Sequence, residues 1–282
     1  MSLAILEATK FAKILTRHHL SPAEQGAGAD YFIATNSTET FNGGSGRDTV
    51  SYHQSTTGVN VNLFDPGAEI GGFARGDKLL FIENVIGSNE ADRLVGTSGA
   101  NILVGLNGND TIFGGGGADR LYGDGGNDTI SNFGARGVAS FMDGGADIDT
   151  LQFGTNGGSA EITTGTGRDF VEIKITNSQD FRVVITDFQP YWEAFGNTVT
   201  ETEALQGDRL KLSFNSLLGT DINAVTQYEQ EIIGDDLILH FDNATVHGDI
   251  VFQDIGQWLD LTTNNGFTFF VETDFYQLPQ AV

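Results

Sequence analysis

A nine-residue repeat between Gly87 and Ser131 most constrains how this chain can fold. Five units follow one another without a gap: GSNEADRLV, GTSGANILV, GLNGNDTIF, GGGGADRLY and GDGGNDTIS. Each has Gly at its first position, Asp or Asn at its sixth and an aliphatic residue at its eighth. Gly and Asn accept the tight turn of the first half, and the second half ends in a β-type triplet. One unit therefore predicts a turn and a short strand, and two units predict one coil of a flattened solenoid.

The eighth positions predict the core of this solenoid. Side chains alternate along a strand, so the eighth residues all point the same way, and only the interior removes them from water. These residues are Leu94, Leu103, Ile112, Leu121 and Ile130. Because each unit supplies one aliphatic side chain, we expect a thin core that apolar burial alone holds weakly.

The sixth positions predict sites for a divalent cation. Units two apart lie on the same edge, so Asp92, Asp110 and Asp128 stack on one edge, and Asn101 and Asp119 on the other. Carboxylates stacked at strand spacing, about 4.8 Å, repel each other, and a hard cation between coils removes that repulsion. A shell of oxygen ligands suits calcium and not zinc. Several calcium ions are therefore expected; a Gly-rich loop or an acidic disordered tail is the alternative.

The composition limits the classes of partner. The net charge is −24, with 38 acidic against 14 basic residues, which excludes nucleic acid and disfavours an anionic membrane surface. A calcium-free chain this acidic is expected to repel itself and fold poorly, so that metal binding supplies folding free energy. There is no Cys for disulfide bonds, no apolar run long enough to span a membrane, and no apolar segment typical of a cleaved signal peptide.

The N-terminal residues 3–17 follow a helical pattern. Ile5, Ala8, Phe11, Ala12 and Leu15 share one face, and Ser21-Pro22 would end the helix. We expect residues 1–25 to form an amphipathic α-helix that caps one end of the solenoid. A membrane or partner anchor is the alternative.

Further repeats and strands flank the array. Isolated units are GGSGRDTVS at 43–51 and GGADIDTLQ at 144–152, so the β-roll region is predicted to span residues 26–152. From 153 to 282 alternating patterns predict an antiparallel, β-sandwich-like region. Its candidate strands are 170–176, 181–186, 208–214, 236–241, 249–252 and 267–272, with a helical turn at 215–218. The fold class predicted is thus all-β apart from the N-terminal helix.

These residues resemble the RTX (repeats-in-toxin) β-roll. Residues 40 to about 215 are similar to the C-terminal domain of serralysin-type secreted metalloproteases, through DTVSY at 48–52, VNVNL at 59–63, IENVIGS at 82–88, the tandem repeats, and GDRLKLS at 207–213. The resemblance implies a calcium-loaded β-roll, and export to the extracellular space by a type I secretion apparatus that reads an uncleaved C-terminal signal.

The resemblance also implies a set of calcium ligands. The segment that matches IENVIGS contributes Glu83 and the carbonyl of Phe81, which face the turn carbonyls of Ser88 and Glu90 and the Asp92 carboxylate. Asn101 replaces an Asp and brings no charge. The full candidate set is Asp48, Phe81, Glu83, Ser88, Glu90, Asp92, Asn101, Gly105, Asn107, Asp110, Gly114, Gly116, Asp119, Gly123, Gly125, Asp128, Asp147 and Asp149.

No catalytic motif accompanies the repeats, so we expect no enzyme activity. The chain has neither the H-E-x-x-H of a zinc protease nor G-x-S-x-G nor a Cys nucleophile. His18-His19 end the expected helix, where positive charge suits the dipole. A pair of carboxylates could also serve a glycosidase-like reaction, but with 38 acidic residues such pairs are expected by chance.

Three functions remain open on the sequence. The first is a secreted calcium-binding structural or interaction module, and the second is a surface adhesin or S-layer-like protein that self-associates. The third is an accessory that acts on or binds polysaccharide, for which Tyr191, Trp192, Trp258 and Tyr276 are candidate stacking residues, although core packing is the more common role of aromatics.

Overall fold

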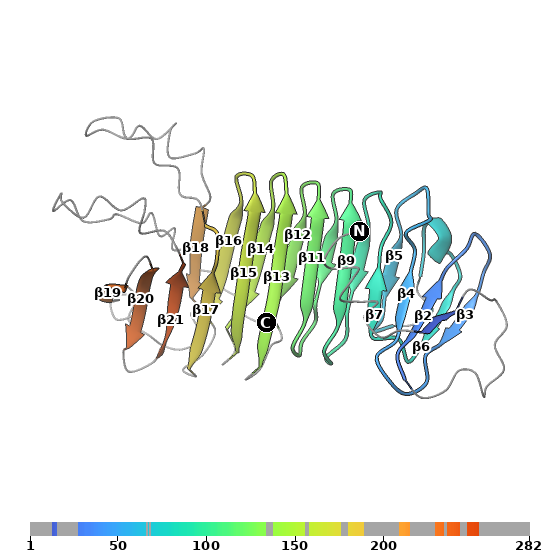
Figure 1. The fold of residues 1–282 in the computed structure, drawn as a ribbon, viewed down its shortest axis with the longest axis horizontal. Helices are drawn as coiled ribbons and strands as arrows, with labels where there is room; N and C mark the ends of the chain where they lie inside the picture. The colour runs from blue at the N-terminus through green and yellow to red at the C-terminus, as the bar shows by residue number, and fades with distance from the viewer. Residues whose placement is uncertain are drawn as a thin grey trace, which may run out of the picture.

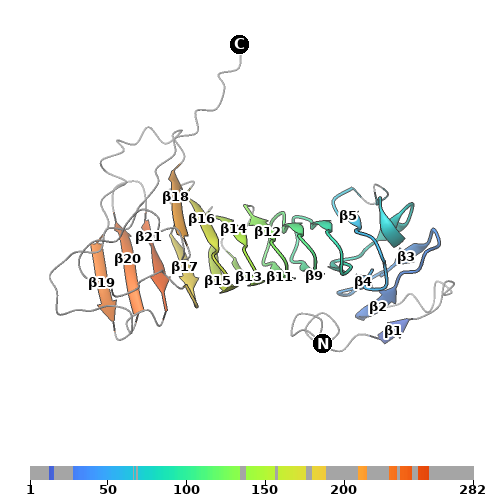
Figure 2. The ribbon, with the colours of Figure 1, turned by 90° about the horizontal axis from the view of Figure 1, so that it is seen from above.

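The computed structural model shows a flattened β-solenoid built from two parallel sheets that face each other (Figures 1 and 2). The structure describes residues 13–15, 28–65, 67, 69–133, 138–155, 158–175, 180–188, 209–214, 229–233, 236–242 and 247–253. The chain alternates between the two sheets, so each strand pairs with the strand one full coil away. This arrangement confirms the predicted β-roll.

The first sheet has 12 strands and the second has 7. In spatial order the first sheet contains β1 (Lys13–Leu15), β2 (Asp30–Ile33), β4 (Thr49–Ser51), β7 (Asn84–Ile86), β9 (Ile102–Asn107), β11 (Arg120–Gly125), β13 (Ala139–Ala146), β15 (Ser159–Thr166), β17 (Phe181–Ile185), β21 (His247–Phe252), β20 (Asp236–Asp242) and β19 (Glu229–Ile233). The second contains β18 (Arg209–Phe214), β16 (Phe170–Ile175), β14 (Thr150–Gly154), β12 (Thr129–Asn132), β10 (Thr111–Phe113), β8 (Arg93–Val95) and β5 (Asn60–Asn62). A separate pair joins β3 (Thr40–Asn42) to β6 (Lys78–Leu80).

The register of the strands reproduces the two-unit coil. Ile112 pairs with Leu94 on one side and with Ile130 on the other, a step of eighteen residues each way. Beyond the tandem array the step from Asp128 to Asp149 is 21 residues and the next, to Asp169, is 20. The loops therefore absorb the extra residues, and the strands stay in register.

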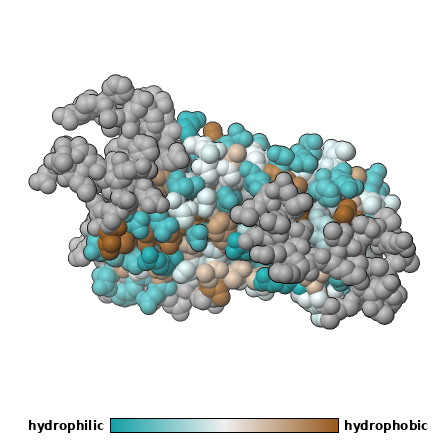
Figure 3. Space-filling view, viewed as in Figure 1, coloured by the Kyte–Doolittle hydropathy of each residue, from teal (hydrophilic) through white to brown (hydrophobic). Residues whose placement is uncertain are grey.

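The interior confirms the role of the eighth positions. Leu94, Leu103, Ile112, Leu121 and Ile130 are all 0% exposed and stack in one continuous core between the sheets. The same core runs on through Phe153, Ile173 and Phe252 towards the C-terminal strands. Hydrophilic residues cover most of the described surface visible in Figure 3, which suits a molecule of net charge −24.

The C-terminal region continues the solenoid before it changes character. Strands β14 to β18 and β21 pair in parallel, and only β19, β20 and β21 pair antiparallel at the end of the first sheet. Five predicted strands match β16, β17, β18, β20 and β21. Strand 267–272 and the turn at 215–218 lie outside the described residues, and the division into domains at 152/153 stays a prediction.

The predicted N-terminal helix is wrong where the structure describes it. Residues Lys13–Leu15 form β1, which pairs in parallel with β2 through Lys13–Asp30, Ile14–Tyr31 and Leu15–Phe32. The edge of a sheet offers unpaired N–H and C=O groups, and pairing with them outweighs the weak local preference of a three-residue segment for a helix. The rest of residues 3–17 lies outside the described part.

The only regular helical element in the described ranges is a 3-10 turn, η1 (Gly72–Ala74). Accordingly, those ranges hold no helix long and apolar enough to cross a membrane.

Candidate metal centre

The sixth-position aspartates form a hydrogen-bonded ladder along one edge of the solenoid. We call this the first edge; its loops precede the strands of the second sheet. The Asp92 N–H donates to Asp110 Oδ1 (2.7 Å), Asp110 N–H to Asp128 Oδ1 (2.7 Å), and Asp128 N–H to Asp149 Oδ1 (2.8 Å). All four side chains are at most 4% exposed. The predicted stacking of these carboxylates is thus confirmed, and one oxygen of each accepts a backbone N–H from the preceding coil.

The second oxygen of most of these carboxylates is buried without a hydrogen-bond partner. This holds for Oδ2 of Asp110, Asp128 and Asp149, and for Asp48 on the opposite edge. Burying a charged oxygen without a hydrogen-bond partner or a counter-ion costs on the order of several kcal/mol. These carboxylate oxygens therefore need a proton or a cation as their partner.

A carbonyl oxygen shares the space beside each of these atoms. A Cβ on Gly105 would overlap Asp110 Oδ2 and lie 2.9 Å from the carbonyl oxygen of Gly123 in the next coil. The same holds at Gly123, where a Cβ would overlap Asp128 Oδ2 and the Gly144 carbonyl. The first position must therefore be Gly, and the cradle above it is bordered by one carboxylate and one carbonyl oxygen. Mixed oxygen donors of this kind suit a hard cation such as calcium.

Burial shifts the acidity of the ladder. Burial, together with the neighbouring charges of Asp128, Asp92 and Asp124, raises the pKa of Asp110 to about 8. Burial likewise raises the pKa of Asp128 and Asp149 to about 7. Near pH 7 the binding of either a proton or a metal ion would offset the free-energy cost of burying these negative charges.

The structure places Glu83 and the Phe81 carbonyl beside Asp48 on the opposite edge, and not beside Ser88, Glu90 and Asp92 on the first edge as the resemblance implied. Asp48 N–H donates to Glu83 Oε2 (2.9 Å), and burial, with Glu83 and Asp30 close by, raises the pKa of Asp48 to about 6. A Cβ on Gly43 would overlap both the Phe81 carbonyl oxygen and Asp48 Oδ2. One carbonyl oxygen and one carboxylate oxygen therefore border this cradle too.

Other candidates take different places. Ser88 donates its hydroxyl to Asp92 Oδ1 (2.8 Å) and to the Glu90 carbonyl (3.3 Å), and its N–H donates to Asp92 Oδ2. The side chains of Glu90 and Asp147 are exposed, although the charge of Asp147 contributes to the raised pKa of Asp128. Gly116 donates its N–H to the Thr97 carbonyl (3.0 Å), and Asn107 donates its amide to Asn89 (2.7 Å). Gly125 pairs with Asn107 in the first sheet.

Several members of the ladders escaped the sequence analysis. Asp30 N–H donates to Asp48 Oδ1 (2.8 Å), Asp149 N–H to Asp169 Oδ1 (2.8 Å), and Glu39 N–H to Asp77 Oδ1 (2.7 Å). The signal was present in degenerate units: 34–42 has Glu39 at the sixth position and Phe41 at the eighth, and 164–172 has Asp169 and Val171 there.

No group of three or more His, Cys, Asp or Glu side chains converges as a metal cage within the described ranges. His18 and His19 at the end of the expected helix lie outside those ranges, as do the candidate stacking residues Tyr191, Trp192, Trp258 and Tyr276.

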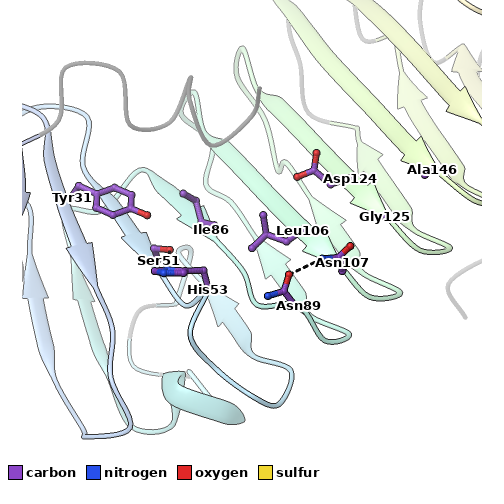
Figure 4. A pocket seen from close by; sticks show the side chains of 10 residues that line it. All are labelled: Tyr31, Ser51, His53, Ile86, Asn89, Leu106, Asn107, Asp124, Gly125 and Ala146. Carbon is purple, nitrogen blue, oxygen red and sulfur yellow. Dashed lines mark hydrogen bonds between the residues drawn. The ribbon is translucent and has the colours of Figure 1, made fainter. Parts of the chain in front are cut away.

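A pocket of about 680 Å³ opens on the outer face of the first sheet (Figure 4). Tyr31, Ile86 and Leu106 line it, and Figure 4 shows the hydrogen-bonded pair Asn89 and Asn107 at one side. Its apolar residues belong to a small cluster distinct from the interior core. Asn107, Asp124 and Gly125 also line the pocket, and the charge of Asp124 reaches Asp110 and Asp128 of the ladder.

The fold and the site define a β-roll, a solenoid whose loops carry glycines and stacked, buried carboxylates. Residues 26–50, 86–119 and 95–130 match the family model of the RTX calcium-binding nonapeptide repeat, in 4 copies. With the fold, this match identifies the chain as a protein that carries an RTX calcium-binding β-roll. No curated protein matches the chain.

Proposed function

We propose that the chain is a secreted, non-catalytic module whose β-roll folds when it binds extracellular calcium. The observation that carries the proposal is the row of buried Asp Oδ2 atoms that lack hydrogen-bond partners, each beside a glycine cradle. Cytosolic calcium is too dilute for such sites, because extracellular modules bind at around 10⁻⁴–10⁻³ M. Folding would therefore follow export.

The proposed ligands are the sixth-position carboxylates Asp48, Asp92, Asp110, Asp128 and Asp149, with Glu83. They would share the ions with loop carbonyls, among them those of Phe81, Gly105 and Gly123. When bound, calcium supplies positive charge that compensates these carboxylates. The protein residues fix the coil spacing and exclude water.

Export by a type I apparatus is part of the proposal. The match to the RTX repeat supports it, and the sequence motifs by which residues 40 to about 215 resemble the C-terminal domain of serralysin-type proteases suggested it. Outside the cell the stiffened solenoid would present its two sheet faces as a structural or interaction surface.

Circular dichroism and titration calorimetry of the full chain, first in EGTA and then in millimolar calcium, test the folding step. We expect a largely unfolded spectrum in EGTA and cooperative folding with calcium. Asp110→Asn should lower calcium affinity at its site by at least about tenfold, the loss typical of perturbed metal sites. Asp180→Asn removes an exposed charge and serves as the matched control. An identical spectrum and melting point in EGTA and calcium would end the proposal.

Secretion needs a separate test. The full chain, expressed with and without the type I apparatus of a Gram-negative host, should reach the medium only when the apparatus is present. Equal amounts in the medium without it would refute this export route and leave the calcium-dependent folding untouched.

A further inference from the structure

The two edges of the solenoid differ in the charge of their sixth positions. Strand register aligns Asp92, Asp110, Asp128, Asp149 and Asp169 along the first edge without interruption. The second edge comprises the loops that precede the strands of the first sheet. Register aligns its residues in the order Asp48, Glu83, Asn101, Asp119 and Ser140. Carboxylates are therefore lost from the second edge in the middle of the array.

An amide fills the cradle that would otherwise bind an ion at Asp119. A Cβ on Gly114 would lie 2.6 Å from Asp119 Oδ2 and 3.1 Å from Asn132 Nδ2. Asn132 Nδ2 donates to Asp119 Oδ2 (2.9 Å) and to Ser140 Oγ (3.1 Å). On the first edge a carbonyl oxygen takes the equivalent place. Here an N–H donor points at the carboxylate, and its positive end repels a cation.

Asn101 makes a similar link one coil earlier. Its Oδ1 accepts the Thr97 N–H (2.8 Å), and its Nδ2 donates to the Glu83 carbonyl (2.6 Å). Asn101 N–H donates in turn to Asp119 Oδ1 (2.9 Å). The amide gives the Glu83 carbonyl a hydrogen-bond donor, and it adds no negative charge that would attract an ion.

We propose that Asn101 and Asn132 close the middle of the second edge with amide hydrogen bonds, so that calcium binds along the first edge and at Asp48–Glu83 but not at Asp119. The proposal rests on the proposed calcium binding. These two asparagines are positioning residues that determine which coils bind metal. The array thus has one metal-dependent edge and one edge that carries its own bridges.

Calcium counting on matched variants tests the asymmetry. Titration calorimetry of the full chain in calcium should show that Asp128→Asn removes at least one equivalent, whereas Asp119→Asn removes none. Both changes delete the same charge at the same repeat position, and circular dichroism in calcium checks that each variant folds. Equal losses from the two variants would overturn the inference.

The reverse experiment adds sites. The double variant Asn101→Asp/Asn132→Gly restores the carboxylate and the first-position glycine, and it should bind at least one more calcium than the parent chain. Asn62→Asp is the control, because it adds a charge on β5, where Asn62 Oδ1 accepts the N–H groups of Phe64 (3.1 Å) and Asp65 (3.4 Å). An unchanged stoichiometry in the folded double variant would contradict the inference. If the parent chain binds no calcium, the proposed function itself fails instead.

Discussion

At the scale of single residues, each repeat position answers a specific steric or electrostatic demand. The first-position Gly leaves room for the Asp Oδ2 of its own unit, and the sixth-position Asp accepts an N–H from the preceding coil. The fourth position adds a backbone demand: Gly108 has φ 119°, and a Cβ there would lie 2.5 Å from the Glu90 carbonyl carbon. The residue types of the repeat are therefore set by the positions at which neighbouring coils approach each other closely.

The first-position demand predicts a large difference between two glycine variants. Gly105→Ala should destabilise the calcium-loaded protein by about 1–3 kcal/mol, the usual cost of overpacking, because its Cβ overlaps Asp110 Oδ2. Gly99→Ala, in the same array, meets only Thr97 Oγ1 at 3.4 Å and should be close to neutral. Thermal melts in millimolar calcium measure both. Similar melting points for the two variants would show that the cradle yields easily.

The core positions give a second prediction at this scale. Leu121→Ala removes a side chain that is 0% exposed and should cost about 2–5 kcal/mol, as truncation of buried leucines usually does. Val95→Ala, at a half-buried ninth position, should cost clearly less. Denaturant titration in calcium compares the two. Equal costs would argue against the eighth positions as the main source of apolar stabilisation.

At the scale of elements, the sequence predicted most where the pattern repeats. The coil of two units and its inward eighth positions follow from the period alone, because five units in phase leave one way to bury their aliphatic residues. The N-terminal helix failed because a pattern of apolar spacing says nothing about a free strand edge nearby. Lys13–Leu15 pairs with β2 instead.

The candidate site was predictable in part for a similar reason. Sixth positions with Asp or Asn could be read from the repeat, whereas Glu39 and Asp169 sit in units whose first position is not Gly. Asn132 could not be read as a bridge, because its contact with Asp119 crosses 13 residues and joins the end of β12 to the residue before β11. Such links follow from three-dimensional register and not from local pattern.

The antiparallel strands at the C-terminal end carry a pH-dependent link. His240 Nδ1 lies 2.8 Å from Asp249 Oδ1 on β21, and its Nε2 lies 3.1 Å from Glu231 Oε2 on β19. Arg182 on β17 faces the same Asp249 at 3.4 Å. The hydrogen bond to Asp249, supported by Glu231, raises the pKa of His240 above 6.5.

A raised histidine pKa fixes the sign of the effect. Its stabilisation of β19–β21 is complete below the unfolded value of about 6.5 and is lost as the pH rises through the folded pKa. NMR titration of the His240 ring should give a midpoint above the unfolded value of about 6.5, and amide exchange in β20 should quicken over the same range. His240→Asn should abolish this pH dependence. A midpoint at or below the unfolded value would refute the link.

At the scale of the whole molecule, the net charge of −24 gives rise to two kinds of repulsion, one between exposed charges and one between buried carboxylates. Exposed charges are screened by salt over about 10 Å at 0.1 M, whereas buried carboxylates such as those of Asp110 and Asp128 are screened much less. Monovalent salt therefore weakens the general repulsion but leaves the ladder uncompensated. Magnesium demands a tight octahedral shell and dehydrates reluctantly, so it fits carbonyl-rich cradles poorly.

Ion specificity of compaction follows from this difference. In EGTA the full chain should be expanded, with a radius of gyration towards roughly 60 Å, and millimolar calcium should bring it towards roughly 20–25 Å, the range for a folded chain of this length with some elongation. Sodium chloride or magnesium at matched ionic strength should give only a small contraction. Small-angle scattering measures all four conditions on one preparation. Compaction by sodium equal to that by calcium would mean that surface charge alone keeps the chain open, and the buried ladder would then lose its role as the step that couples metal binding to folding.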